Sequence, residues 1–179
     1  MINEIDVKIL NIIQQDARIA NAEIARQVGL APSAVLERIK KLEERGVIRG
    51  YAAEIDAKQV DFGLTAFVAV RTKDCCAEND AALAAIPEVL EVHDVAGEDS
   101  YLLKVRARNG EELAKLLREK IRSIPNVTAT KTTVVLQTLK ETTALPIEQS
   151  SDDEAEIKSA AKAKKREKKR LKLKKEQEV

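Results

Sequence analysis

The sequence has few of the residues from which metal sites and redox centres are built. Its 179 residues include one histidine, His93, and two cysteines, the adjacent Cys75 and Cys76. Neighbouring cysteines cannot form an ordinary unstrained disulfide with each other, and two alone do not make a multi-cysteine metal site. A lone histidine within a predicted strand is more often a packed residue than a ligand or catalyst. We therefore predict no metal, no cofactor and no catalytic residue.

Long apolar runs are also absent. No segment approaches the ~20 apolar residues that a membrane span needs, and the N-terminus lacks the apolar core of a signal peptide. These absences predict a cytoplasmic protein without a membrane partner. The net charge is only +1, but residues 1–147 carry 20 Lys/Arg against 22 Asp/Glu, whereas residues 148–179 carry 11 against 8. The positive excess therefore lies at the C-terminal end.

The stretch from Asn21 to Gly46 has the pattern of two short helices that meet at a tight turn. Asn21 is a good N-cap, Gly29 suits the positive φ at which a helix ends, and Pro32 suits the first position of the next helix. Two helices in this arrangement are typical of a helix-turn-helix that reads DNA, although ordinary helical hairpins share the pattern. The second helix would be the one that enters the major groove.

The flanking segments extend this pattern to a small domain. A first helix is predicted over Glu4–Gln15, with Asn3 as its N-cap and Asp6 three residues on. After the helix pair, Val47–Ile55 holds β-forming residues broken by a glycine, which predicts a short strand or wing beside the DNA backbone, with Arg49 as its phosphate contact. The apolar positions expected to form the shared core are Ile9, Ile13, Ile24, Val28, Val35, Ile39 and Leu42.

Beyond a hinge at residues 56–63, strand and helix patterns alternate. The predicted strands and helices are, in order, Thr65–Thr72, Glu78–Ile86 (helix), Val89–Ala96, Tyr101–Ala107, Gly110–Ser123 (helix) and Val127–Leu139. The order βαββαβ predicts an α+β protein with a ferredoxin-like second domain, an antiparallel sheet with both helices on one face. The other face would need water, a partner or a second copy. Candidates for these buried surfaces are Phe67, Val89, Leu103 and Val135, and the sequence does not assign each of them to a face.

The predicted domains are residues 1–55, a winged helix-turn-helix; 56–63, the hinge; 64–147, the ferredoxin-like domain; and 148–179, a charged tail. Ser150–Glu156 is polar and acidic, and Lys158–Lys175 is dense in lysine with too few apolar residues for a core. The tail should be disordered or transiently helical. Two hypotheses for the function of the tail stay open: a solubilising appendage and an accessory contact to nucleic acid.

Four segments together resemble the Lrp/AsnC (feast/famine) family of transcription regulators: IDVKILNIIQQDARIANAEIARQVGLAPSAVLERIKKLEERGVIRGYAAEID, AFVAVR, IPEVLEVHDVAGEDSYLLKVRA and TKTTVVLQTLKET. They cover about Ile5 to Thr142. The resemblance implies a sequence-specific regulator of double-stranded DNA that dimerises through its second domain. It also implies assembly into tetramers or octamers and binding of an amino acid or other small metabolite where dimers meet.

The resemblance also assigns positions on the recognition helix. By position, Ser33, Ala34, Glu37 and Arg38 would approach bases, and the five donors of Arg38 suit guanine or phosphate. Lys40 and Lys41 add positive charge for phosphates. One departure is Ala31, where the family usually has a serine; alanine cannot cap the helix, which costs about 1 kcal/mol unless Ser33 or water takes over the cap.

The effector region implied by the resemblance is the hairpin of Gly97, Glu98, Asp99, Ser100 and Tyr101, with Thr132, Thr133 and Val134 of the last strand. Glu98 and Asp99 could accept the ammonium group of an amino acid. Taken without the family, this segment is also compatible with a plain hairpin turn. Ser100 stands where amino-acid-responsive members usually carry an aspartate, so the identity of the ligand stays open.

Two alternatives accompany the regulator hypothesis. A less specific DNA-organising (nucleoid-associated) protein would share the same DNA-binding domain. Siroheme decarboxylases resemble the two-domain plan, but their proposed chemistry relies on histidines and a large cofactor pocket, and this chain has one histidine, no tryptophan and four Phe/Tyr. We therefore predict that the protein is not an enzyme.

Overall fold

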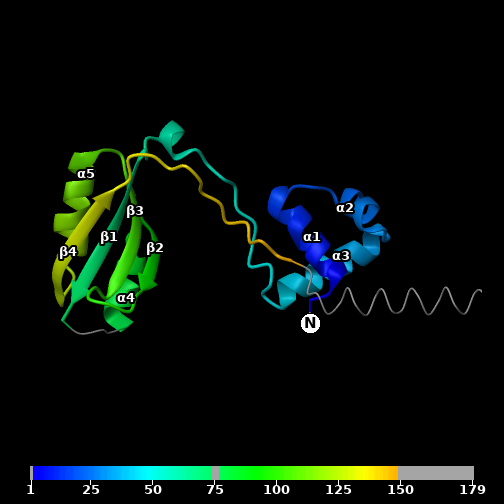
Figure 1. The fold of residues 1–179 in the computed structure, drawn as a ribbon, viewed down its shortest axis with the longest axis horizontal. Helices are drawn as coiled ribbons and strands as arrows, with labels where there is room; N and C mark the ends of the chain where they lie inside the picture. The colour runs from blue at the N-terminus through cyan, green and yellow to red at the C-terminus, as the bar shows by residue number, and fades with distance from the viewer. Residues whose placement is uncertain (1, 74–76, 149–179) are drawn as a thin grey trace, which may run out of the picture. The chain divides into compact units, whose positions relative to one another are not determined.

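The computed structural model describes residues 2–73 and 77–148 (Figure 1). The cysteine pair and almost all of the charged tail lie outside the described residues. The chain forms two compact units. One contains the chain up to Ala52 together with the segment that begins at Thr142, and the other spans Ala53–Glu141. The prediction of a separate hinge at 56–63 stays a prediction.

Three helices build the first unit: α1 (Glu4–Gln15), α2 (Asn21–Val28) and α3 (Pro32–Glu44). The predicted capping box is present, because the Asn3 side chain accepts from the Asp6 amide and the Asp6 side chain accepts from the Asn3 amide. Gly29 ends α2 with φ at 71°, as its sequence position predicted.

The N-cap prediction for α2 is wrong by one residue. Ala20 occupies the cap with extended backbone angles, and Asn21 is the first helical residue. Neither Ala20 nor Ala31, the N-cap of α3, supplies a side-chain cap. Both helices therefore depend on packing rather than on a polar cap at their starts.

The core of this unit contains the predicted apolar positions. Ile9, Ile24, Val35, Ile39 and Leu42 are buried. Ile13 and Val28 are partly buried and pack against the cluster. The three helices therefore share one core, as a helix-turn-helix domain requires.

The predicted strand over Val47–Ile55 is wrong. These residues form a bend and then run without strand structure, and the amides of Val47 and Ile48 donate back to the Leu42 carbonyl oxygen at 2.9 and 3.2 Å. Gly46, with φ at 67°, turns the chain out of α3. Ile48 packs on the core. A strand needs a hydrogen-bonded neighbour, and the described residues offer none to this segment.

The second unit contains a four-stranded antiparallel sheet in the order β2-β3-β1-β4, with the short helix η1 (Ala57–Val60) before it. Its strands and helices are β1 (Leu64–Thr72), α4 (Ala77–Ala84), β2 (Val89–Asp94), β3 (Tyr101–Ala107), α5 (Gly110–Lys115), η2 (Leu116–Ile121) and β4 (Val127–Val134). The predicted βαββαβ order is confirmed. Two strands are shorter than predicted: β2 ends at Asp94, and β4 ends at Val134 instead of Leu139.

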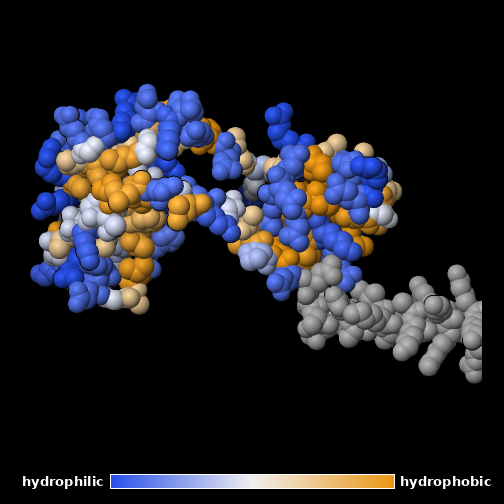
Figure 2. Space-filling model, turned by 45° about the horizontal axis from the view of Figure 1, so that its top comes forward, coloured by the Kyte–Doolittle hydropathy of each residue, from blue (hydrophilic) through white to orange (hydrophobic). Residues whose placement is uncertain are grey.

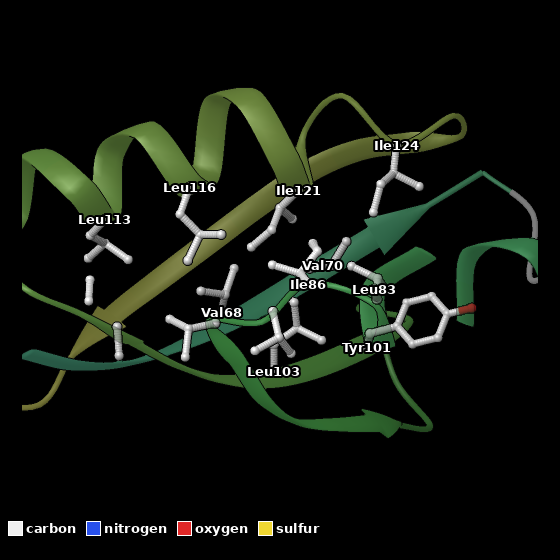
Figure 3. Close-up of a cluster of buried hydrophobic side chains, with 14 residues drawn as sticks. Val68, Val70, Leu83, Ile86, Tyr101, Leu103, Leu113, Leu116, Ile121 and Ile124 are labelled. Carbon is white, nitrogen blue, oxygen red and sulfur yellow. The ribbon is translucent and has the colours of Figure 1, made fainter. Parts of the chain in front are cut away.

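Alternation along the strands decides which sheet face is buried. Val68 and Val70 of β1 and Leu103 of β3 point into the core, where Leu113, Leu116 and Ile121 of α5 and η2 meet them (Figure 3). Leu83 and Ile86, in and just after α4, belong to the same cluster, so both helices cover one face.

The opposite face, which we call the outer sheet face, carries the side chains of Phe67, Ala69, Leu102, Lys104 and Arg106. Phe67, whose face the sequence left open, lies on this outer face, because its position in the alternation points it away from the helices and leaves it 38% exposed within one chain. Val89 and Leu103 are buried as predicted.

The prediction of a packed His93 is wrong, and Val135 is only half-buried. The Val135 amide donates to the Thr65 carbonyl oxygen at 2.9 Å, and Val135 follows Val134, which pairs with the core residue Ala66, so it falls on the outer sheet face. His93 is exposed rather than packed: it lies opposite Leu102 on the edge strand β2, on the outer sheet face, and its ring nitrogen lies 3.2 Å from a Glu91 carboxylate oxygen.

Candidate functional site

Helix α3 presents a polar face to solvent. Ser33, Glu37, Lys40 and Lys41 are exposed, whereas Val35, Ile39 and Leu42 are buried on the opposite side. Ala34 is half-buried, and Arg49 is exposed in the segment after the helix. The exposed face therefore combines groups that contact base edges with groups that contact phosphates.

Arg38 differs from the other predicted DNA contacts because its ion-pair partner is a buried carboxylate, whereas Lys40 pairs with the exposed Glu44 at 3.9 Å. Its Nη1 donates to Oδ1 of Asp6 at 2.8 Å and to Oδ1 of Asn3 at 3.4 Å. The Asp6 side chain is 9% exposed, and that of Arg38 is 32% exposed. The sequence contained both residues but no pattern that would pair positions 32 residues apart.

The chain that leaves α3 is held against it by Tyr51, whose hydroxyl donates to a Glu43 carboxylate oxygen at 2.8 Å. Partial burial and the nearby carboxylate raise the pKa of Tyr51 to about 12, so the hydroxyl stays protonated at neutral pH. Leu36, on the same helix, is 54% exposed, which is unusual for a leucine on a packed helix. In the sequence, this exposure was indicated by the position of Leu36 directly after Val35, which places it off the core face of the helix.

In the second unit, Arg71 holds the hairpin between β2 and β3. Its Nε donates to the Glu98 carbonyl oxygen at 2.9 Å, and its Nη2 lies 3.1 Å from the Glu98 carboxylate and 3.5 Å from that of Asp99. Both carboxylates predicted to accept an ammonium group therefore already face a guanidinium. Arg71 was not among the predicted site residues, although it lies on an outward position of β1.

Ser100 and Tyr101 are tied into the sheet and the core. Ser100 Oγ accepts hydrogen bonds from the amide and the hydroxyl of Thr72 at 3.2 and 2.9 Å. Tyr101 is 2% exposed, and its hydroxyl donates to Asp80 at 2.6 Å. Gly97 has φ at 155° and is exposed at the hairpin turn. The hairpin is thus a fixed scaffold with an exposed tip.

Within one protomer, the two groups of residues predicted to bind the effector, the hairpin and the segment of the last strand, do not lie at the same place on the sheet. The hairpin adjoins Val70, because the Ser100 amide donates to the Val70 carbonyl oxygen at 2.9 Å. Thr132, Thr133 and Val134 pair with Val68, Phe67 and Ala66, farther back along β1. The two halves therefore lie at different levels of the sheet.

An ion-pair network crosses the outer sheet face. Lys104 binds Glu91 at 3.0 Å and also Glu141, and Arg106 binds Glu141 at 3.1 Å. Glu91 and Glu141 both have a lowered pKa, and the main cause for each is the hydrogen bond from Lys104. The hydrogen bond to Glu141 in turn raises the pKa of Lys104. The network fastens the chain after β4 to β3.

Within the part of the chain that the structure describes, no cluster of His, Cys, Asp and Glu could hold a metal ion. Among the same residues, no helix has the length and apolar character needed to cross a membrane.

A helix-turn-helix unit joined to a sheet unit with an open face and a fixed hairpin defines a two-domain regulator of the DNA-binding class. Residues 2–49 match the family described as winged helix-turn-helix DNA-binding, and residues 65–145 match the Lrp/AsnC ligand binding domain. The chain belongs to the Lrp/AsnC family of transcription regulators, and the prediction that it is not an enzyme is confirmed.

Relatives match over nearly their whole length. The chain is 42% identical over 147 residues to the HTH-type transcriptional regulator FL11 of Pyrococcus horikoshii, covering 82% of this chain and 97% of that one. It is 40% identical over 148 residues to the leucine-responsive regulatory protein of Haemophilus influenzae, covering 80% and 89%. The crystal structure of the transcriptional regulator NMB0573 from Neisseria meningitidis in complex with L-Met is similar, with a TM-score of 0.78, 32% identity and coverage of 82% and 97%.

Proposed function

We propose that the protein regulates transcription by binding specific sites on double-stranded DNA as a homodimer or larger homo-oligomer, in response to an amino acid or a related small metabolite. The observation that carries this proposal is the exposed face of α3, with polar side chains opposite a fully buried apolar face. Helices of this kind lie in the major groove with their N-terminal residues on base edges.

Three predicted contact residues of α3 have chemical counterparts on base edges. The methyl group of Ala34 suits contact with a thymine methyl, Glu37 can accept from the cytosine amino group, and Ser33 can donate or accept. Lys40, Lys41 and Arg49 are exposed cations that suit phosphates. We assign base reading to the first three and backbone contact to the other three.

A homodimer would bury the outer sheet face. Apolar side chains are visible on the surface of this unit (Figure 2). On the outer sheet face, Phe67 is 38% exposed. Half-buried Ala69 and Leu102 lie beside Phe67 on β1 and β3. An antiparallel sheet with helices on one face leaves such a surface for a partner, and a second copy offers the same surface by symmetry.

The effector proposal rests on the hairpin and on the methionine bound by the Neisseria relative. Since Gly97–Tyr101 and Thr132–Val134 lie apart in one protomer, a site using both would draw them from two copies. Ser100, which Thr72 already contacts twice, supplies no carboxylate for a ligand ammonium group. We therefore propose an effector site between two copies of the chain. The polar groups of the hairpin and of Thr132–Val134 would determine which ligand it binds.

We expect sites selected by the protein from random DNA to contain repeated half-sites spaced by about 10 bp or a multiple, because two recognition helices on one face of DNA must enter successive major grooves. In-vitro selection followed by footprinting measures this spacing. Recovery of one unrepeated half-site bound by a monomer would sink the oligomer proposal. Uniform protection with no recurring motif would instead favour the DNA-organising alternative.

We expect Gly97→Val to abolish the thermal shift that an effector amino acid causes in the full-length protein, since valine rarely adopts a φ of +155° and would reshape the hairpin tip. A ligand at 100 times its Kd should stabilise the wild type by roughly 2.7 kcal/mol. A thermal-shift screen of the common amino acids measures this stabilisation.

Gly110→Val is the matched control, because a Cβ at Gly110 meets nothing within 4 Å and its backbone lies outside the left-handed region. The control should respond like the wild type. An equal response of Gly97→Val would remove the hairpin from the site. If no amino acid stabilises the wild type, the amino-acid proposal fails.

A further inference from the structure

We propose that Arg38 is a positioning residue, which fixes the recognition helix α3 against α1 through Asp6, and that it does not read a base. This inference rests on the proposed DNA-binding function. By the family resemblance, Arg38 would approach a base, because its guanidinium suits guanine. The proposal gives it a structural role instead.

The first step concerns the direction in which Arg38 points. Successive residues of a helix are rotated by about 100°. Arg38 follows buried Val35 by three residues and precedes buried Leu42 by four, so it lies next to the core side of α3, and its half-buried side chain leaves on the flank and not at the centre of the exposed face. That flank faces the start of α1, where Asn3 and Asp6 accept from its Nη1.

The second step concerns the carboxylate that Arg38 contacts. Asp6 Oδ2 accepts from the Asn3 amide at 3.1 Å, while Oδ1 accepts from Arg38 at 2.8 Å. Asn3 Oδ1 accepts in turn from the Asp6 amide at 3.0 Å. The capping box of α1 and the side chain from α3 therefore form one hydrogen-bonded network.

Burial makes this network hard to leave. The Asp6 side chain is 9% exposed, so if Arg38 swung out to a base, a buried carboxylate would lose its cation. Removing one partner of a buried pair is strongly unfavourable, because the remaining charge is left uncompensated. A contact between Arg38 and DNA would have to be strong enough to compensate for the lost ion pair. Ser33 and Glu37, in contrast, reach solvent without breaking an ion pair.

The third step is what the pair adds to the packing. Ile9 of α1 packs in one apolar cluster with Val35 and Ile39 of α3, and apolar packing has little directionality. The hydrogen-bonded charge pair fixes both distance and orientation. It therefore holds α3 in the orientation that binds DNA. Without the pair, a smaller fraction of molecules has that orientation, which weakens binding to every sequence by the same factor.

The test compares full-length Asp6→Asn, Arg38→Met and the double variant on selected DNA, on single-base variants of that DNA and across a salt series. Each is assayed at a temperature where circular dichroism shows it fully folded. We expect both single variants to weaken binding to all sequences by a similar factor of about 10, and the double variant to be no weaker, because the two residues act as one unit. Base preference and salt slope should not change.

Lys41→Met is the matched control, because it removes one positive charge from the exposed face of the same helix. It should lower the slope of log K against log salt by about 0.9. Should Arg38→Met lower the slope equally while Asp6→Asn does not, Arg38 is a phosphate contact and the proposal is overturned.

Arg38→Lys decides the question even if Asp6→Asn does not fold, since lysine keeps a cation beside Asp6. Intermediate affinity with unchanged base preference supports positioning. A relaxed preference at one base pair makes Arg38 a base reader and overturns the proposal. If the wild type itself does not distinguish selected from shuffled DNA, the proposed function fails, and that outcome is separate from any behaviour of Arg38.

Discussion

Full-length Phe67→Asp is expected to sediment as a monomer and to bind a DNA site with two half-sites at least about 100-fold more weakly than the wild type. Joining two recognition helices in a dimer makes the second contact intramolecular, which raises overall affinity by about 10²- to 10⁴-fold. A variant that cannot dimerise loses that gain while each helix-turn-helix remains intact.

Phe67 is the suitable position because it lies on the central strand β1 and points away from the core. Across a two-fold axis the same patch meets itself, so one substitution places two carboxylates in the interface. Lys104, opposite Phe67 in the register with β3, already binds Glu91 and Glu141. The two new carboxylates would repel each other and lose water where the patches meet, although Lys131 of β4, opposite Ala69, lies on the same face.

Ala81→Asp is the matched control. It adds the same charge at an exposed position of α4, on the helix-covered side of the sheet. Analytical ultracentrifugation and DNA titration of both variants measure the two effects. A dimeric Phe67→Asp with wild-type affinity would show that the outer sheet face is not the interface.

Local signals account for most of the fold that could be predicted from the sequence. The Asn3–Asp6 capping box, Gly29 at a helix end and Pro32 at a helix start each act within a few residues, and all three are present in the structure. Alternation predicted β3 to the residue, because Tyr101, Leu103 and Val105 face one core.

Errors arose where the outcome depends on distant residues. The Val47–Ile55 segment has β-forming residues but no strand to pair with, and propensity does not supply a partner. The outward direction of Phe67 depends on which sheet face the helices cover. Likewise, the Arg38–Asp6 and Arg71–Glu98 contacts join residues 32 and 27 positions apart, and neither pair lies in a periodic pattern.

The sequence therefore predicted the helix that forms the candidate site, but not the different roles of the residues on that helix. Sequence position grouped Arg38 with Ser33 and Glu37 on the recognition helix. The structure separates them, since Arg38 meets a buried carboxylate and the other two face solvent. Arg71, which contacts Glu98 and Asp99 in the hairpin proposed to bind the effector, has the same kind of role in the second unit.

Removal of the charged tail is expected to flatten the salt dependence of non-specific DNA binding. Residues 148–179 contain 11 Lys/Arg, and each that meets a phosphate adds about 0.9 to the slope of log K against log salt. Three contacts per chain would change the slope by about 2.7. The change in affinity between 50 and 200 mM salt would then differ by about 40-fold between the two proteins.

The structure indicates where to cut. Gln14 Nε2 donates to the Leu145 carbonyl oxygen at 3.2 Å, the Leu145 amide donates to Gln14 Oε1 at 2.6 Å, and Asn11 Nδ2 donates to the Ile147 carbonyl oxygen at 3.2 Å. The segment before the tail is thus fastened to α1 of the DNA-binding unit. A stop after Glu148 keeps these contacts, whereas an earlier stop would remove them together with the tail.

A full-length variant with the Lys/Arg residues of Lys158–Lys175 replaced by glutamine is the matched control, since it keeps the length of the tail and removes only its positive charge. Both proteins should keep the wild-type preference for selected sites and show the same shallower slope on random-sequence DNA. The 4 acidic residues between Asp152 and Glu156 could instead occupy the basic run within the chain. In that case the truncated and wild-type lines would run parallel, or the truncated line would be steeper, and the tail would not be a DNA contact.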